Sequence, residues 1–259
     1  MRLLPEHLIA TGQPVVPLET ITRLVGLPSR TVHSGLQRLR QGGRLFSPAR
    51  GLYVAVPPEY RSRGVVPAEW FVDPVMRYLR RSYYVGLLTA AAMHGAGHQA
   101  PQVFQVMLDT QLANRDLGPV RLRFHVNSLL SKGVELPVDL QTTHTGTLRL
   151  ASRELTAVDL VAHPTHSGGL SNVATVLAEL EDLDAARLAG ICRHHPRVVA
   201  RRLGWLLEGF GGDTDVQPLR AVAAPGEGEL LPLDHHGARA GKAAPSWGLI
   251  INTEIERDV

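Results

Sequence analysis

The sequence is poor in the features that mark several specialised classes of protein. It has one cysteine, Cys192, in 259 residues, so it can form neither an internal disulfide nor a cysteine-rich zinc module. No segment approaches the roughly 20 consecutive apolar residues that cross a bilayer, and Pro5 and Glu6 lie where a secretion signal has its apolar core. These absences predict a folded protein of the reducing cytoplasm, outside any membrane.

The common catalytic motifs are also missing. The sequence contains no GxSxG nucleophile motif, no GxxxxGK[ST] phosphate loop and no strand-borne carboxylate cluster of the kind a nuclease uses. His94 with His98, and Cys192 with His194 and His195, have spacings that suit a metal. However, glycines weaken any helix through 94–98 and no nearby carboxylate supplies a further ligand. We therefore expect a protein that is not an enzyme and that holds no cofactor and no metal.

Charge is divided unevenly along the chain. With 44% hydrophobic and 20% charged residues, the composition is that of an ordinary globular protein, and the length favours two domains. Residues 1–81 contain 12 Arg and 5 acidic residues, a net charge of +7, whereas residues 82–259 carry a net charge of −4. Positive charge concentrated in a small domain attracts a polyanion, because each neutralised phosphate releases counterions. The N-terminal part is therefore expected to bind nucleic acid.

Two short helices followed by a β-hairpin are predicted in the first 60 residues. Residues 18–25 form an amphipathic pattern that ends at Gly26, and Ser29 lies where a second helix would have its N-cap. In the second helix, residues 30–41, Val32, Leu36 and Leu39 form one narrow apolar stripe. Gly42 and Gly43 end it, and residues 44–46 and 52–56 are predicted to pair around a turn at 47–51. This order is typical of a winged helix-turn-helix.

The face opposite the apolar stripe carries no carboxylate and many groups that recognise DNA. Arg pairs with guanine, Gln pairs with adenine, and hydroxyls bond to bases or phosphates. We predict that Arg30, Thr31, Ser34 and Gln37 read bases. Arg38, Arg40, Arg44 and Arg50 are predicted to hold phosphates, and Arg50 also to reach a neighbouring minor groove. The complete candidate set for DNA binding is Ser29, Arg30, Thr31, His33, Ser34, Gln37, Arg38, Arg40, Arg44 and Arg50.

A basic helix can also be a solvated face, and some winged helices bind only proteins. Between residues 18 and 63, however, the chain has eight Arg and two acidic residues, which solubility alone does not require. We therefore favour binding to double-stranded DNA.

The rest of the chain predicts a larger domain of helices and strands. Pro57, Pro58, Gly64 and Pro67 interrupt regular structure, so we divide the chain into a winged helix-turn-helix at 1–60, a linker and connecting helix at 61–81, and an α/β domain at 82–259. Helices are predicted at 74–79, 83–94, 155–161, 172–183, 184–192 and 196–210, and strands at 103–108, 120–126, 138–142, 147–150 and 247–251. Residues 221–244 are glycine-rich and expected to be loose. The fold class is α+β, with a mixed sheet and a C-terminal helical portion.

A second basic surface is also considered on the last long helix. Arg197 and Arg201 lie one turn apart beside Arg202, which would suit nucleic acid or a toxin's substrate. The alternative is a solvated helix face, which we favour.

The chain resembles the AbiEi family, the antitoxins of the abortive-infection AbiE type IV toxin–antitoxin systems. The resemblance extends over almost the whole chain and is carried by Gly51-Leu52-Tyr53, by residues 83–96 (YYVGLLTAAAMHGA) continuing into 98–106, by residues 153–161 (RELTAVDLV) and by residues 247–256. It implies autorepression through DNA upstream of its own operon, and phage defence by countering a nucleotidyltransferase-like toxin encoded beside it. It also implies that antitoxin and toxin need no stable complex. Family members differ in their recognition residues.

Two other functions remain open on the residues alone. The first is a ligand-sensing transcription factor whose C-terminal domain binds a metabolite in an apolar pocket. The second is an enzyme, such as a nuclease, with a DNA-targeting module. The absence of a coiled-coil pattern predicts a monomer in solution, and such domains commonly bind inverted-repeat operators in several copies.

Overall fold

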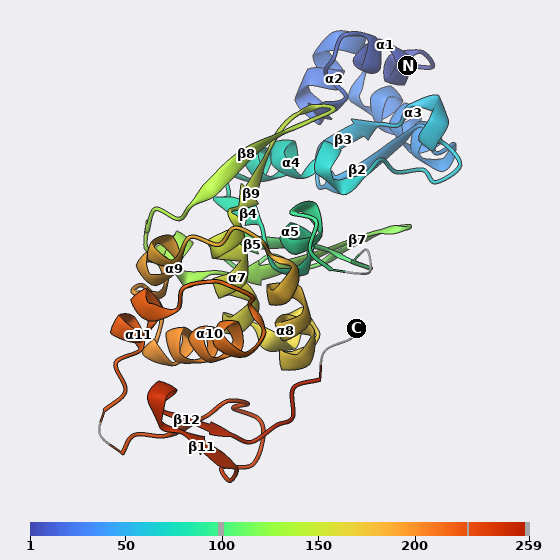
Figure 1. The fold of residues 1–259 in the computed structure, drawn as a ribbon. Coiled ribbons are helices and arrows are strands. Elements are labelled where there is room, and N and C mark those ends of the chain that lie inside the picture. The colour runs from blue at the N-terminus through green and yellow to red at the C-terminus, as the bar shows by residue number, and fades with distance from the viewer. Residues whose placement is uncertain (98–100, 227, 257–259) are drawn as a thin grey trace. The chain divides into compact units, whose positions relative to one another are not determined.

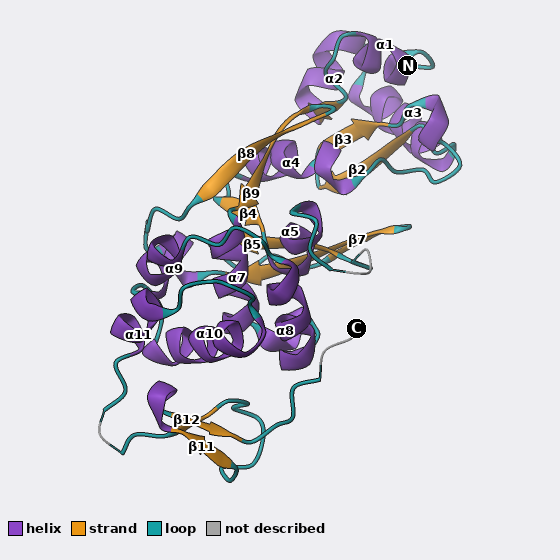
Figure 2. Cartoon of the chain, in the orientation of Figure 1, coloured by secondary structure: helices purple, strands orange, loops and turns teal. Residues whose placement is uncertain are grey.

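The structure is a computed structural model that describes residues 1–97, 101–226 and 228–256 (Figure 1). The chain divides into two compact units, each built from separate stretches of sequence. The first comprises Met1–Tyr84, Gln102–Lys132 and Leu140–Arg149, and the second comprises Val85–Pro101, Gly133–Asp139 and Leu150–Val259. Helices and strands alternate along the chain (Figure 2), which confirms the predicted α+β class. No helix in the described ranges is both long and apolar enough to span a membrane.

The N-terminal part of the first unit, residues 1–56, is named here the helix–hairpin module. It contains helices α1 (Leu4–Ala10), α2 (Leu18–Val25) and α3 (Ser29–Gln41) and strands β1 (Val15–Pro17), β2 (Leu45–Ala49) and β3 (Leu52–Ala55). The strands form a sheet in the order β1-β3-β2. The predicted stripe of α3 is buried, with Val32 0%, Leu36 1% and Leu39 7% exposed, and it packs in one core with residues of α1 and α2. The predicted element order is therefore confirmed, and α1 and β1 were not predicted.

Two features of this module, the N-cap of α3 and the turn of the hairpin, lie at other residues than predicted. Ser29 is the first residue of α3 rather than its N-cap, because Pro28 occupies the cap position and Ser29 makes no capping bond. The hairpin turn is shorter than predicted: β2 continues to Ala49 through an irregular register, so only Arg50 and Gly51 separate the strands. Glycine at 51 permits this tight turn because its φ is +79°, which an L side chain rarely adopts.

A six-stranded mixed sheet has most of its residues in the first unit. Its order is β6 (Arg115–Leu117), β7 (Val120–Val126), β5 (Phe104–Leu108), β4 (Tyr83–Val85), β9 (Gly146–Ala151) and β8 (Val138–Thr143). β5 pairs with β7 in parallel and β6 with β7 antiparallel. The prediction of a helix from Tyr83 was wrong, because residues 83–85 form the inner strand β4 and helix α5 (Leu87–Met93) begins after Gly86. Strand and helix are both apolar and buried, so periodicity could not separate them.

Three short elements connect the module and the sheet within the first unit. They are the 3₁₀ turns Pro58–Tyr60 and Ala68–Trp70 and helix α4 (Val72–Leu79), with α6 (Ser128–Ser131) following β7. Phe71 is fully buried with its ring 5.1 Å from that of Phe46 on β2. The indole of Trp70 stacks on the imidazole of His144, which lies between β8 and β9, with 4.1 Å between ring centres. The tip of the β8–β9 hairpin therefore packs beside the module.

The second unit is mostly helical. Besides α5 it contains α7 (Arg153–Ala162), a 3₁₀ turn at Pro164–Ser167, α8 (Gly169–Glu179), α9 (Ala185–Cys192), α10 (Arg197–Phe210) and α11 (Gln217–Ala223). A small sheet follows, in the order β10 (Leu231–Pro232), β12 (Leu249–Ile251), β11 (Lys242–Ala244). Most described residues of 221–244 lie in turns and loops, and only the end of α11, β10 and β11 are regular there. Trp247 ends the 3₁₀ turn Pro245–Trp247 instead of beginning the predicted strand.

Candidate nucleic-acid interface

Helix α3 has one buried face and one exposed polar face. The exposed residues are the predicted candidates Ser29, Arg30, Thr31, His33, Ser34, Gln37, Arg38 and Arg40, with Gln41 beside them. The helix contains no carboxylate, and within the described part of the chain Arg30, Arg38 and Arg40 have no acidic partner. A face of this kind offers hydrogen-bond donors and positive charge without an internal counterion, which is what a phosphate backbone or the edge of a base requires.

Two short bonds arrange the first turns of α3. His33 Nδ1 lies 2.8 Å from the backbone oxygen of Ser29, and the hydroxyl of Ser34 donates to the oxygen of Thr31 at 3.1 Å. Because a backbone oxygen only accepts, Nδ1 carries the proton in this pairing and Nε2 is left as an acceptor. His33 thus offers an acceptor, and Arg30 donors, from the same end of the helix.

Arg44, predicted to hold a phosphate, is engaged within the protein. Its Nη2 lies 2.6 and 2.7 Å from the two carboxylate oxygens of Glu6 and donates to the backbone oxygen of Arg2 at 2.7 Å. Arg61 reaches the same carboxylate at 2.6 Å. The hydrogen bond from Arg44 is the main cause that lowers the pKa of Glu6 below its usual value. Glu6 on α1 therefore holds Arg44, three residues after the end of α3, and Arg61, in the segment beyond the hairpin.

Arg50 lies exposed at the tip of the β2–β3 hairpin. Its backbone oxygen accepts a hydrogen bond of 3.2 Å from the hydroxyl of Tyr78 on α4, so the tip is held from one side while the guanidinium extends into solvent. The hairpin is therefore a short, supported loop with one positive charge at its end.

The three arginines of the predicted second basic surface do not share one exposed face. Arg197 is exposed, but Arg201 is 1% exposed, donates to Ala223 O at 3.1 Å and pairs with Glu229 at 2.7 Å. Arg202 is half-buried and donates to the backbone oxygen of Pro232 at 3.0 Å. Arg201 thus braces the C-terminal segment instead of facing a partner. Gly204 lies one turn later on the same face of α10. A glycine at that position was the only signal in the sequence that this face packs closely against another segment.

The histidines and the cysteine whose spacing suits a metal are buried or hydrogen-bonded within the protein where the structure describes them. His94 Nε2 lies 2.7 Å from the backbone oxygen of Ala151, while His98 falls outside the described residues. Cys192 is buried, which raises the pKa of its thiol to about 12. Burial also lowers the pKa of His195 to about 4. Within the described ranges, no three His, Cys, Asp or Glu side chains are grouped so as to hold a metal.

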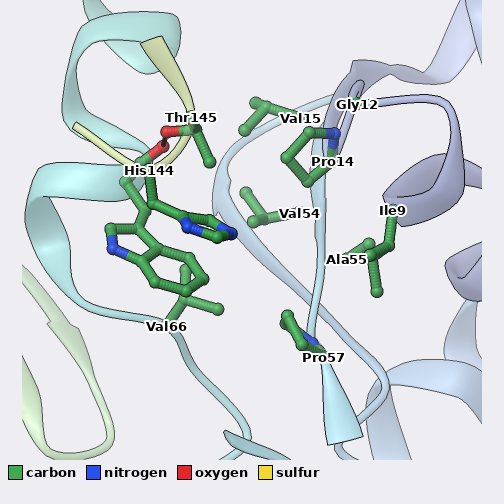
Figure 3. Close-up of a pocket in the computed structure, with 11 residues that line it drawn as sticks. Ile9, Gly12, Pro14, Val15, Val54, Ala55, Pro57, Val66, His144 and Thr145 are labelled. Carbon is green, nitrogen blue, oxygen red and sulfur yellow. Dashed lines mark hydrogen bonds between the residues drawn. The ribbon is translucent and has the colours of Figure 1, made fainter. Parts of the chain in front are cut away.

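A small cavity lies inside the first unit, beside the tip of the β8–β9 hairpin. Its volume is about 80 Å³, and its lining is mostly apolar. Figure 3 shows His144 and Thr145 on one side, with Pro14, Val15 and Val54 of the module across from them. The hydroxyl of Thr145 donates to the backbone oxygen of Trp70. These contacts support the module from the side of the β8–β9 hairpin, and the lining offers no charged group to a ligand.

Comparison with known proteins gives two findings. Residues 84–209 match the family model described as the AbiEi antitoxin C-terminal domain. Among solved structures, the crystal structure of the RV2827C protein from Mycobacterium tuberculosis superposes with a TM-score of 0.65 at 18% identity, covering 95% of this chain and 89% of that chain. This likeness shows a shared fold along nearly the whole chain. No curated protein matches the sequence.

Proposed function

From the match of residues 84–209 to the model of the AbiEi antitoxin C-terminal domain, we propose that the chain is an antitoxin that also represses its own operon by binding operator DNA. The family match supports a role in a toxin–antitoxin system. We assign the DNA-binding role to the helix–hairpin module, which we take to be a winged helix-turn-helix, and the neutralising role to the larger remainder of the chain.

One observation carries the DNA-binding proposal: α3 buries Val32, Leu36 and Leu39 and exposes an opposite face with three Arg, two Gln and no acid. In this arrangement α3 enters the major groove, where Arg30, Thr31, Ser34 and Gln37 meet base edges. Arg38 and Arg40 lie toward the helix end and meet phosphates, and Arg50 reaches the backbone or the minor groove from the hairpin. Arg44 stays with Glu6 and contributes indirectly.

The partners follow from the same proposal. The operator lies upstream of the chain's own operon and consists of inverted repeats, each bound by one copy of a protein that is a monomer when free. The toxin is a nucleotidyltransferase-like protein from the same operon, and its neutralisation needs no stable complex. Both partners act in the cytoplasm.

The first test is binding to the DNA upstream of the chain's own gene. Fluorescence anisotropy with that duplex and with a scrambled duplex, from roughly 50 to 200 mM salt, separates sequence-specific from electrostatic binding. We expect tight binding to the first duplex and a steep loss of affinity with salt. Equal affinity for both duplexes would contradict the proposed repressor role and would indicate that the protein binds DNA without sequence specificity.

Two substitutions test the assigned roles. Arg30→Ala is expected to cost about 1–3 kcal/mol of binding to the cognate duplex and much less on the scrambled one, because a base contact is lost. Arg50→Ala is expected to weaken both duplexes alike, because a phosphate contact carries no sequence information. Arg193→Ala removes an equally exposed charge from the second unit and serves as the control. An equal loss on both duplexes for Arg30→Ala would contradict its base-reading role.

A further inference from the structure

An open groove runs along one side of α3 within the first unit. One wall is the C-terminal half of the helix, with Gln37 and Arg40, and the other is the loop that carries Arg63. The start of β2 and the turn between β6 and β7, at Gly118, complete its lining. The groove lining includes two arginines and no carboxylate. A nearby acid, Asp116 on β6, is already paired with Arg123 at 2.8 Å.

The loop that presents Arg63 is held in place by several contacts. The backbone nitrogens of Arg63 and Gly64 both donate to Tyr60 O at 3.0 Å. Gly43, just after α3, has φ +64°, and a Cβ there would lie 2.9 Å from the backbone oxygen of Arg61, so glycine allows loop and helix end to touch. Arg61 is in turn paired with Glu6. Segment 61–64, predicted as part of a linker, is thus a fixed wall next to α3.

These positions separate Arg63 from Arg61, its neighbour two residues earlier. Arg61 forms an ion pair with Glu6, whereas Arg63 is exposed and, within the described ranges, has no acidic partner. Arg63 therefore shares the groove with Arg40, and both charges face one channel beside the helix. Two like charges that line one groove repel each other, so an anion bound between them would relieve that repulsion.

We propose that Arg63, together with Arg40, binds the phosphate backbone that borders the major groove entered by α3. The inference rests on the proposed DNA binding and adds a contact that comes from neither the helix nor the hairpin. A helix seated in a major groove about 12 Å wide has a phosphate strand along each flank, and the groove beside α3 lies where one of these strands passes.

The test measures how the binding constant depends on salt. Losing one phosphate contact reduces the slope of log K against log salt by about 0.9. Arg63→Ala is expected to lower the slope by about that amount and to weaken cognate and scrambled duplexes by a similar factor, on the order of fivefold at the lower salt. Arg63→Lys keeps a positive point charge and is expected to restore most of the slope. Arg193→Ala is the control for a lost surface charge, and circular dichroism melting confirms that each variant is folded.

The outcomes distinguish this inference from the function on which it rests. If the unaltered protein fails to bind the upstream duplex, the proposed function fails. If the unaltered protein binds specifically and Arg63→Ala keeps both its slope and its affinity, the phosphate contact is overturned and the function stands. A loss confined to the cognate duplex would also overturn it, because Arg63 would then be contacting bases.

Discussion

His195 is an ionisable side chain whose protonation opposes folding. It follows α9 in the second unit, and its Nε2 is buried without a hydrogen-bond partner among the described residues. Burial is the main cause that lowers its pKa to about 4 from the usual 6.5, and the nearby His163 and His194 add to the effect. The folded protein thus holds His195 neutral over a pH range in which the unfolded chain binds a proton.

The sign of the pH effect follows from this difference. Between pH 6.5 and about 4 the unfolded state binds more protons at His195 than the folded state, so the free energy of unfolding falls as the pH falls through this window. His195→Gln is expected to remove on the order of 1 kcal/mol of that decline, after allowance for solvent screening. Urea unfolding at pH 7 and pH 4.5 measures it. His7→Gln, at an exposed position on α1, provides the control. An unchanged decline in the His195 variant would show that other groups cause it.

For single residues, the sequence predicted which side chains are exposed better than it predicted which side chains form ion pairs. The polar face of α3 could be predicted because apolar residues at helical spacing fix which side is buried. The engagement of Arg44 by Glu6 could not, because the two residues are 38 positions apart and belong to elements whose packing no local pattern records. Arg201 was predicted to lie on a basic surface because its ion pair with Glu229, 28 residues away, also leaves no local pattern. A long-range ion pair has no signature in a single sequence.

Among the elements, α10 depends on one small residue. Gly204 faces the indole of Trp247, and a Cβ at position 204 would lie 2.1 Å from the Trp247 ring. The same indole donates to Glu208 Oε2 at 2.6 Å and has the guanidinium of Arg220 4.4 Å above it. Trp247 is fully buried, so it cannot move aside without breaking these contacts.

Gly204→Ala is therefore expected to lower the free energy of unfolding by about 3 kcal/mol, because overpacking displaces the buried indole. Gly209→Ala in the same helix is the matched control. No atom lies within 4 Å of a Cβ at 209, so alanine there should stabilise the helix by up to about 1 kcal/mol. Thermal melts of the two variants measure the difference. Equal melting temperatures would mean that α10 and Trp247 are less tightly packed than the distances indicate.

Long periodic elements were predictable and short ones were not. Helices α2, α3 and α10 and strand β7 each carry an apolar pattern long enough to fix their type, and the structure places them within one residue of the prediction. Elements of two or three residues, such as β4, β6 and β10, contain too few positions to show a period. Pairing with distant strands makes them strands.

For the whole molecule, the two proposed activities should be separable by point substitution. A double variant, Arg30→Ala with Gln37→Ala, changes only exposed side chains of α3, so the fold and the family domain at 84–209 are left intact. We expect it to lose repression of a reporter fused to the operon promoter and to keep neutralising the toxin in a growth assay. Loss of both activities in a folded variant would show that neutralisation also uses α3.

Deleting residues 1–65 would disturb more of the fold than the sequence suggests. The first unit continues through Gln102–Lys132 and Leu140–Arg149, and removal of the module would expose Phe71 and the cavity wall at His144 and Thr145. The predicted boundaries near residues 60 and 81 stay a prediction, because compactness in the folded chain does not show which segments fold alone. The uneven charge and the proline- and glycine-containing junction suggest continuous domains, and contacts between distant segments leave no mark in the sequence.

The interleaving of segments in the first unit also sets the order of events on the ribosome. The β8–β9 hairpin that supports the module ends near residue 150, about 110 residues after the end of α3. At about 5–20 residues per second, synthesis of the intervening stretch takes roughly 5 to 20 seconds. During that time the nascent chain carries helix α3 without the hairpin tip that packs beside the module. A polypeptide released by a stop before β8 would then carry the module without that support.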